Sequence, residues 1–373
     1  MGRLTSSIIP RLLYQHMLNT HNYCVIMAGG LGTRFWPISR KAMPKQFLEF
    51  SGQNGLSFLQ MAYDRMSELV PAENIIVVTL KEFKDLVKTQ LPGIPEENIL
   101  LEVYNRNTAP CIAYAAKEIL RRDPQAVMIA TPADHVIENG DEFVSTLRLA
   151  LDYAAENRRL ITIGIVPSRP DSNFGYIQVE GGSQAIKAGL PVAVKTFTEK
   201  PSKEIAEVFL QSGEFLWNSG IFVWQATLIL EELGKYAPEI MCLWDESDDI
   251  DRIYTDCQRV SIDYAVMEKT DRATVIPARF KWADIGNWES LYDHLAIGDE
   301  DGNVTNSLAK HLFKEDKSNI IFTQKKGKLL AVRGMENMIV VDTEDVLMIC
   351  PRDEDKIKDF LSELAMPEFE EYR

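Results

Sequence analysis

Short apolar runs alternate with longer amphipathic segments through roughly the first 230 residues of the chain. The runs predict strands, and the segments, whose apolar residues recur every three or four positions, predict helices. Strands are expected at 23–27, 74–79, 126–130, 160–165, 175–179, 192–198 and 220–224, and helices at 57–67, 108–121, 142–157 and 203–211. Such alternation predicts a doubly wound, mixed and mostly parallel α/β sheet that binds its ligand beyond the carboxyl ends of the strands.

The pattern changes after residue 305, where brief apolar runs are separated by Gly, Asn or Asp. The runs are 319–323, 328–332, 338–342 and 346–350, and a helix is expected at 353–364. This predicts a small β module ending in a helix, with no repeat at a fixed period. We therefore expect an N-terminal extension over 1–22, an α/β domain over 23–304 and the module over 305–373. Exposed strand edges make the module a candidate homodimer contact.

The start of the chain is expected to lie outside the α/β domain. Met17 stands six residues before the first predicted strand, so residues 1–16 are expected to be a poorly ordered extension or an alternative start. Pro10 and Arg11 interrupt any secretory apolar stretch.

Residues 25–48, VIMAGGLGTRFWPISRKAMPKQFL, carry an apolar strand into a glycine turn that is followed by four cationic side chains and no acidic one. Gly29, Gly30 and Gly32 let backbone N–H groups approach a ligand, while Arg34 and Lys45 can neutralise phosphate oxygens. The stretch predicts a polyphosphate-binding loop. It is neither a Walker loop, which needs GxxxxGK before Ser or Thr, nor a dinucleotide GxGxxG turn.

Composition limits the class of protein. With 373 residues, 46% of them hydrophobic and 25% charged, the chain is an ordinary globular protein, and its net charge of −15 argues against nucleic acid as a partner. No apolar run approaches the roughly 18 residues that cross a membrane. The five cysteines form no CxxC pair, which argues against a disulfide framework or a zinc site. A cytoplasmic location is expected.

Two aspartates from distant parts of the sequence are candidate metal ligands. Asp134 follows a predicted strand in ATPADH, and Asp284 stands in FKWADIGNW. Together they can share one Mg²⁺, a hard ion that prefers oxygen ligands, whereas each alone also fits a turn or cap. His135 is interpreted as structural because imidazole suits Mg²⁺ poorly. Asn107 and Thr108 begin a predicted helix, where capping and nucleotide contact both remain open.

Eight strings over residues 22–365 resemble, in order, those of the sugar nucleotidyltransferase family. They are GTRFWPISR, PKQ, NTAP, TPADH, FGYI, FTEKP, NSGIF and WADIGNW, and they are most similar to the mannose-1-phosphate guanylyltransferases. The resemblance implies a Rossmann-like domain, a left-handed parallel β-helix in the module, and transfer of GMP from GTP to mannose 1-phosphate. It implies Mg²⁺ as the cofactor and in-line attack of the sugar phosphate on the α-phosphorus, with pyrophosphate leaving.

The resemblance also implies roles for individual residues. The catalytic group is Arg34, Lys45, Asp134 and Asp284, of which the two aspartates hold the metal. The nucleotide-binding group is Ala28, Gly29, Gly30, Gly32, Thr33, Arg34, Asn107, Thr108 and Pro132. The sugar-phosphate group is Gly175, Tyr176, Glu199, Lys200, Asn218 and Ser219. Without the resemblance, Glu199 and Lys200 read as a surface charge pair.

Three alternative functions fit the residues to different degrees. A transferase for another sugar phosphate or base stays open, because no residue by itself dictates guanine. A catalytically silent paralogue that binds nucleotide sugars is expected to have lost a loop cation or an aspartate, and this chain keeps all four. A nicotinamide-dependent oxidoreductase lacks its GxGxxG turn. Longer family members append an isomerase module with metal-binding histidines; only His294 and His311 follow Asp284, so isomerase activity is not expected.

Overall fold

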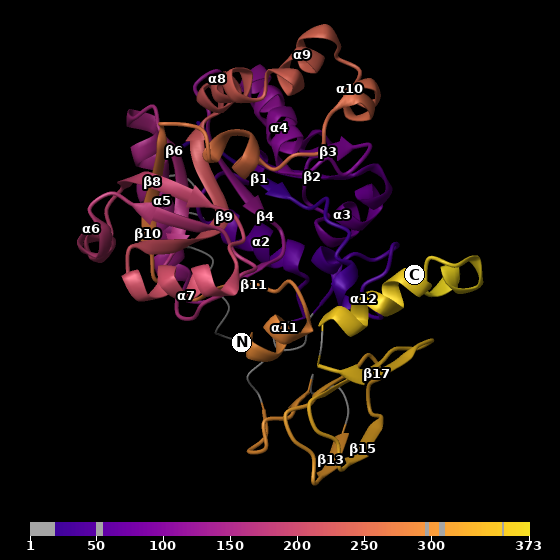
Figure 1. Ribbon diagram of the computed structural model, residues 1–373. Coiled ribbons are helices and arrows are strands. Elements are labelled where there is room, and N and C mark those ends of the chain that lie inside the picture. The colour runs from indigo at the N-terminus through magenta and orange to yellow at the C-terminus, as the bar shows by residue number, and fades with distance from the viewer. Residues whose placement is uncertain (1–18, 50–54, 295–297, 306–309, 353) are drawn as a thin grey trace, which may run out of the picture. The chain divides into compact units, whose positions relative to one another are not determined.

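A computed structural model of the chain describes residues 19–49, 55–294, 298–305, 310–352 and 354–373 (Figure 1). The described residues pack into two compact units. Unit 1 comprises the residues up to Gly29 together with Ala62–Ala133 and Ile137–Trp282. Unit 2 comprises Gly30–Met61, Asp134–Val136 and Ala283–Arg373. The predicted extension over 1–16 lies outside the described residues, and the predicted domain boundary at 305 stays a prediction.

Unit 1 is built on a nine-stranded sheet with the order β3-β2-β1-β4-β9-β6-β10-β8-β7. Its strands are β1 (Asn22–Met27), β2 (Ile75–Leu80), β3 (Ile99–Glu102), β4 (Val127–Pro132), β6 (Leu160–Ile165), β7 (Tyr176–Val179), β8 (Val192–Thr198), β9 (Phe215–Gln225) and β10 (Ala273–Ala278). β9 runs antiparallel to both β4 and β6, and β8 runs antiparallel to β10 and β7. The remaining strands share one direction, which confirms the expected mixed, mostly parallel α/β sheet.

Helices cover this sheet because their apolar faces match its buried strands. They are α3 (Lys84–Gln90), α4 (Thr108–Arg122), α5 (Gly140–Glu156), α6 (Gly182–Ala188), α7 (Lys203–Ser212), α8 (Ala226–Tyr236), α9 (Pro238–Glu246), α10 (Ile250–Asp256) and the π-helix η6 (Asp263–Met267). α4 and α8 pack together in one apolar cluster with alternate residues of β1, among them Tyr23 and Val25 (Figure 1). α5 contacts β4, β6, β9 and β10 through its own buried stripe, which includes Phe143 and Leu147.

Strand β9 differs from the sequence-based prediction. A strand was expected only over 220–224, with Asn218 and Ser219 just before it, but β9 begins at Phe215 and includes both polar residues. Ser219 is satisfied inside the sheet, since its hydroxyl donates to the Ile163 carbonyl at 2.6 Å and accepts from the Ile221 amide at 3.2 Å. Polar side chains with partners of this kind do not interrupt a strand.

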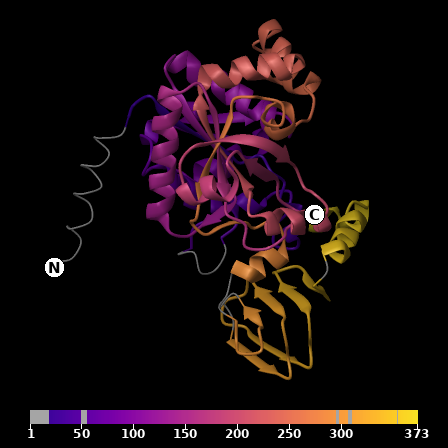
Figure 2. The same cartoon turned by 60° about the vertical axis from the view of Figure 1, so that its left-hand side comes forward.

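Unit 2 contains a β module of short parallel rungs, which lie side by side in Figure 2. Its elements are α11 (Trp288–His294), β12 (Val304–Thr305), β13 (Lys310–Lys314), β14 (Ile320–Thr323), β15 (Leu329–Arg333), β16 (Met338–Asp342), β17 (Leu347–Pro351), α12 (Glu354–Glu363) and the 3-10 helix η7 (Pro367–Tyr372). β12, β14 and β16 pair in parallel, as do β13 and β15, while β17 closes the first sheet antiparallel to β16.

An asparagine ladder joins successive rungs of the module. Asn319 is fully buried, and its amide nitrogen donates to Asn303 Oδ1 at 2.9 Å and to the Met335 carbonyl at 2.8 Å. Its Oδ1 accepts from the Met338 amide at 2.9 Å. Asn319 thus reaches 16 residues back to Asn303 and 19 residues forward to Met338. Because the two spacings differ, the sequence shows no fixed period.

Unit 2 also gathers chain segments that are distant in sequence. Phe35, Phe58, Trp288 and Phe322 share one apolar cluster with strands of the β module. Two short strands, β5 (His135–Ile137) and β11 (Trp282–Asp284), pair with each other, while α2 (Phe58–Met66) follows the glycine loop. The β5–β11 pairing explains how residues 150 positions apart in the chain come together.

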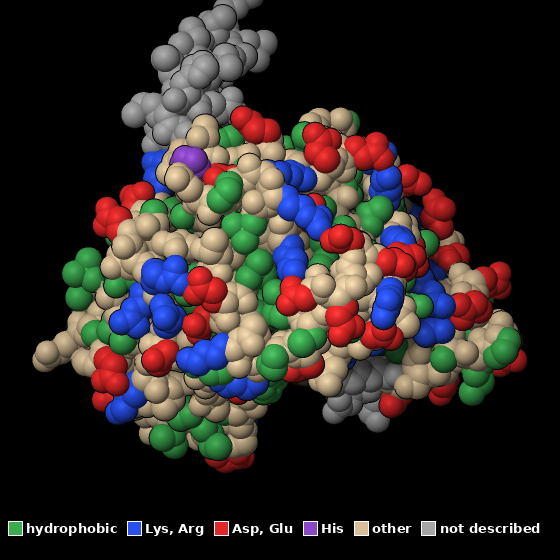
Figure 3. Space-filling model, turned by 90° about the horizontal axis from the view of Figure 1, so that it is seen from above, with side chains coloured by type: hydrophobic (Ala, Val, Ile, Leu, Met, Phe, Trp, Pro, Cys, Tyr) green, Lys and Arg blue, Asp and Glu red, His purple; other side chains and the backbone are tan. Residues whose placement is uncertain are grey.

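Two further features concern the surface charge and the helices. On the face seen in Figure 3, Lys and Arg side chains are interspersed with Asp and Glu, and no uniformly basic surface forms there. Within the part of the chain that the structure describes, no helix combines the length and apolar character needed to cross a bilayer.

We expect Asn319→Ala to destabilise the β module by on the order of 1–3 kcal/mol, because it leaves the Met338 amide without its acceptor and removes the side-chain bonds to Asn303 and Met335. The matched control is Leu329→Ala, since Leu329 is 59% exposed and packs little. Thermal unfolding, with hydrogen exchange of residues 310–351, measures the difference. Equal stability of the two variants would contradict a structural role for the ladder.

Candidate active site

The strongest charge cluster of unit 2 surrounds Lys45. Its ammonium lies 2.7 Å from Asp134 Oδ2 and 3.6 Å from Asp284 Oδ1. The lysine side chain is only 4% exposed, whereas the two carboxylates are 35% and 41% exposed. A buried ammonium needs negative charge beside it, so the two aspartates compensate Lys45 while each keeps an exposed side toward solvent.

Local backbone geometry places Lys45 there. Gly32 has a φ of 58°, in the left-handed region, and a Cβ atom on it would lie 2.5 Å from the Cβ of Lys45. Only glycine lets the turn pack this tightly on the short 3-10 helix η2 (Lys45–Phe47). The ammonium also lies 5.7 Å from the ring centre of Phe35 and 5.4 Å from that of Phe58, where cation–π attraction assists its burial.

Arg34 lies beside the same cluster. It is in the 3-10 helix η1 (Thr33–Phe35) that begins after Gly32. A Cβ atom at Gly286 would lie 3.5 Å from Arg34 Nη1 and 4.0 Å from both carboxylate oxygens of Asp284. The guanidinium of Arg34 and the carboxylate of Asp284 therefore both lie within contact distance of one point beside Gly286. The structure thus brings together Arg34, Lys45, Asp134 and Asp284, which sequence analysis predicted as the catalytic group.

A metal ion fits the carboxylates of this cluster. One ligand atom each of Asp134, His135 and Asp284 lie within 4.8 Å of one another. Burial opposes ionisation of Asp134, but the charges of Lys45 and His135 outweigh it, and the pKa of Asp134 lies below its ordinary value. An ionised carboxylate pair is the donor set that a hard divalent cation prefers. Sequence analysis interpreted His135 as structural, and its 5% exposure is compatible with that role.

The predicted nucleotide-binding residues differ in how their side chains are used. Asn107 has a φ of 71° and caps α4, with its side chain accepting from the Thr108 amide at 2.8 Å. The Thr108 hydroxyl accepts from the Ile262 amide at 2.8 Å. Capping therefore explains Asn107, and nucleotide contact by either residue stays a prediction. Ala28 is buried, and Pro132 ends β4 beside Met27.

The glycine turn itself is held by two side-chain amides. Asn105 donates to the carbonyl of Gly29 at 2.8 Å within unit 1, and Gln46 donates to that of Gly30 at 2.9 Å within unit 2. Thr33 opens η1, and its carbonyl accepts from the Trp36 amide at 3.1 Å. Both amides fix carbonyl groups of the turn, which leaves its N–H groups as the atoms that can meet an anion.

Four of the predicted sugar-phosphate residues meet in unit 1. The Gly175 carbonyl accepts a hydrogen bond from the backbone amide of Asn218 at 2.8 Å. A Cβ atom at Gly175 would lie 2.4 Å from Glu199 Oε2. Lys200 Nζ pairs with Glu199 Oε1 at 2.9 Å. Lys200 has a φ of 46°, a strained value for a non-glycine residue of the kind that clusters at functional sites. Burial disfavours the charge of Lys200, but Glu199 outweighs it and raises the lysine pKa.

Two other predicted sugar-phosphate residues are engaged inside the fold. Tyr176 is fully buried, and its hydroxyl accepts from the Asp171 amide at 3.0 Å. Ser219 is 1% exposed and bonded within the sheet. Both side chains form hydrogen bonds within the fold, because the alternation of each strand points them toward the interior.

Sequence analysis missed Asp263, which lies beside this second cluster. Its Oδ1 accepts from Asn218 Nδ2 at 2.9 Å, while Asn218 Oδ1 accepts from the Thr162 hydroxyl at 3.1 Å. The two contacts fix which way the Asn218 amide points. Burial, with the nearby charge of Glu199, raises the pKa of Asp263 to about 6. No local sequence signal marks this residue, because its partner is 45 positions away.

Glu102 was also missed. This buried carboxylate ends β3, accepts from the Tyr254 hydroxyl at 3.0 Å, and lies so close to Gly29 that a Cβ there would be 2.7 Å from its Oε2. Burial raises the pKa of Glu102 to about 7, although the Tyr254 hydrogen bond opposes that shift. An acidic residue at the end of an apolar run gives no indication of such burial in the sequence.

Comparisons with known proteins agree on one family. The model described as "Nucleotidyl transferase" matches residues 23–298, and the model described as "MannoseP isomerase/GMP-like beta-helix domain" matches residues 311–364. A mannose-1-phosphate guanylyltransferase of Klebsiella pneumoniae is 38% identical over 366 residues, which cover 94% of this chain and 76% of that protein. The alginate biosynthesis protein AlgA of Pseudomonas aeruginosa is 37% identical over 345 residues, covering 88% of this chain and 69% of AlgA.

A solved structure extends the likeness to the fold. The mannose-1-phosphate geranyltransferase of Thermus thermophilus, as its crystal structure is described, superimposes with a TM-score of 0.83 at 26% identity. The match covers 93% of this chain and 100% of that one.

We expect Glu102→Gln to stabilise the protein at pH 8 and to have little effect near pH 4.5. The raised pKa means that the folded state holds a proton that the unfolded state releases between pH 4.5 and about 7, so wild-type stability falls as pH rises through that window. The amide carbonyl still accepts from Tyr254 and carries no charge. Melting temperatures measured from pH 4.5 to 8 test this, and a difference between the two proteins that does not grow with pH would contradict it.

Proposed function

The chain belongs to the nucleotidyl transferase family, among the mannose-1-phosphate guanylyltransferases, and we propose that it transfers GMP from GTP to mannose 1-phosphate, yielding GDP-mannose and pyrophosphate. The observation that carries this proposal is the convergence of Arg34, Lys45, Asp134 and Asp284 in unit 2. Two cations and two carboxylates are the groups that transfer of a nucleotidyl group from a metal-bound triphosphate requires.

We assign the phosphates of GTP to this cluster. The N–H groups of the glycine turn and the Arg34 guanidinium supply positive charge for the triphosphate, and guanidinium pairs well with phosphate oxygens. Lys45 has a different role in this proposal. Because its ammonium is buried and paired with both aspartates, it holds the two carboxylates at their spacing and lowers the charge of the site.

The donor set favours Mg²⁺ as the cofactor. Asp134 and Asp284 would hold the ion with carboxylate oxygens, while the buried imidazole of His135 is a poor ligand for so hard a cation. Held by these two carboxylates, Mg²⁺ would supply positive charge that neutralises the negative charge developing on the phosphate groups.

We assign mannose 1-phosphate to the cluster of Gly175, Glu199, Lys200 and Asn218 in unit 1. Glu199 is 13% exposed and can accept from two sugar hydroxyls, and Lys200, 63% exposed, offers its ammonium to the phosphate. Asp263 accepts a hydrogen bond from Asn218 Nδ2 and so fixes the orientation of the Asn218 side-chain amide in this cluster. Gly175 leaves space against Glu199 that any side chain would fill.

The proposed reaction is an in-line displacement. An oxygen of the sugar phosphate attacks the α-phosphorus of GTP, a new P–O bond forms, and the bond to the β-phosphate oxygen breaks as pyrophosphate leaves. No protein nucleophile is required. Arg34 in unit 2 offers positive charge to the triphosphate, and Lys200 in unit 1 offers it to the sugar phosphate. Positive charge placed where negative charge develops is the main source of catalysis in phosphoryl transfer.

The choice of substrates is tested by incubating the purified protein with mannose 1-phosphate and each of ATP, CTP, GTP and UTP. We expect pyrophosphate release with GTP and Mg²⁺, and none after chelation of the metal. Glucose 1-phosphate with GTP serves as the sugar control. Faster release with another nucleotide or sugar would replace the proposed substrates while keeping the reaction class.

We expect Arg34→Ala to lower kcat by roughly 100- to 1000-fold, as the loss of one electrostatic catalytic donor does elsewhere, with little change in melting temperature. Arg333→Ala is the matched control, because Arg333, the last residue of β15, forms an exposed ion pair with Glu315. Its kcat is expected to equal that of the wild type. Near-normal turnover by a folded Arg34→Ala protein would defeat the proposed role.

A further inference from the structure

The segment between Arg34 and Lys45 is fastened to the last residues of the chain. Trp36 Nε1 donates to the carbonyl of Tyr372 at 2.7 Å, and Arg40 Nη1 donates to the same oxygen at 2.6 Å. The Lys41 amide donates to the Arg373 carbonyl at 2.8 Å. One backbone oxygen therefore joins Trp36, near the start of this segment, to Arg40 in its middle.

Arg40 makes this fastening rigid. Its Nε donates to the Pro37 carbonyl at 2.7 Å, and its Nη2 pairs with Asp345 Oδ1 at 2.8 Å. Backbone hydrogen bonds of 3.1 Å in both directions link Arg40 with Met43, two residues before Lys45. A planar guanidinium with all three nitrogens engaged has little freedom to move.

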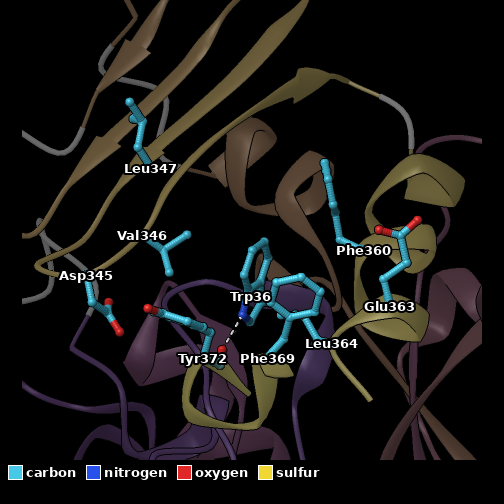
Figure 4. A pocket seen from close by; sticks show the side chains of 9 residues that line it. All are labelled: Trp36, Asp345, Val346, Leu347, Phe360, Glu363, Leu364, Phe369 and Tyr372. Atoms are coloured by element: carbon cyan, nitrogen blue, oxygen red, sulfur yellow. Dashed lines mark hydrogen bonds between the residues drawn. The ribbon is translucent and has the colours of Figure 1, made fainter. Parts of the chain in front are cut away.

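The surroundings of Trp36 show why its hydrogen bond matters. A cavity of about 360 Å³ lies beside the indole and is lined mostly by apolar side chains, including Val346, Phe360 and Leu364 (Figure 4). Phe360 approaches only to 6.0 Å between ring centres. Because packing leaves space on this side of the indole, the bond from Nε1 to Tyr372, dashed in Figure 4, fixes its orientation.

The position of Trp36 also affects the candidate catalytic residues. It stands two residues after Arg34, and its carbonyl accepts from Trp288 Nε1 at 3.4 Å. Its neighbour Phe35 is fully buried, packs on Trp288 at 5.6 Å between ring centres, and lies under the Lys45 ammonium. A displaced Trp36 would therefore disturb both η1, which carries Arg34, and the ring beneath Lys45.

We propose that residues 367–373, which we name the C-terminal strap, position the loop that carries Arg34 and Lys45. Trp36 and Arg40 are positioning residues in this arrangement, and the Tyr372 carbonyl is their common acceptor. The inference rests on the proposed function, because it assigns the strap a purpose in catalysis. A shift of about 1 Å in a positioning contact can cost on the order of 100-fold in rate.

Two variants test the strap, one that removes residues 367–373 and one, Trp36→Phe, that keeps an aromatic ring but lacks the Nε1–H donor. We expect hydrogen exchange of residues 33–45 to rise in both without substrate. We also expect kcat to fall roughly 10- to 100-fold while the KM for GTP changes less than about threefold. The control is Arg333→Ala, which removes an exposed ion pair with Glu315 outside both the strap and the loop and is expected to change neither quantity.

The exchange readout separates this inference from the proposed function. Unchanged hydrogen exchange of residues 33–45 in both variants overturns the proposed loop-positioning role of the strap, whatever the activity of the variants. Increased exchange with wild-type kcat in the Trp36→Phe protein overturns its catalytic purpose. If the wild type releases no pyrophosphate while exchange still rises in the variants, the loop-ordering role of the strap stands and the proposed function falls.

Discussion

An ammonium group buried against two aromatic rings requires negative charge beside it, and in unit 2 that requirement ties three distant segments of the chain together. Lys45 is 4% exposed and pairs with Asp134 and Asp284. Removing both carboxylates would leave the buried ammonium without compensation, which costs on the order of several kcal/mol. The same arrangement leaves each carboxylate partly exposed, so the contacts that hold the unit together also form an acidic site next to Arg34.

Glycines make the arrangement sterically possible. At Gly32 a side chain would collide with Lys45. The second cluster follows the same rule, since Gly175 lies against Glu199. In both units, therefore, a charged residue lies in space that a side chain at the glycine would occupy. A side chain at these glycines would push the neighbouring charged groups away. The glycines of the sequence are therefore needed for the geometry of both sites.

Local pattern in the sequence predicted most of this fold, and the family resemblance predicted the first cluster. The strand at 160–165 and the start of α4 at Thr108 are as expected, because periodicity and capping are local properties. Strand β10 was not predicted, because it pairs with β6, a strand that is distant in the sequence. The predicted strand at 220–224 was shorter than β9, because Asn218 and Ser219 are residue types common in turns. Asp263 and Glu102 escaped notice for the same reason, since only tertiary contacts bury them and raise their pKa values.

The shared carboxylate site is tested most directly by titrating Mn²⁺, a paramagnetic substitute for Mg²⁺, into the purified protein without nucleotide and counting bound ions by electron paramagnetic resonance. We expect one site in the wild type and in Asp248→Asn, whose side chain is 91% exposed and remote from the cluster in sequence. Asp134→Asn and Asp284→Asn should each weaken that site at least about tenfold, as loss of a ligand commonly does. Equal Mn²⁺ affinity in all four proteins would contradict a metal site made by these two aspartates.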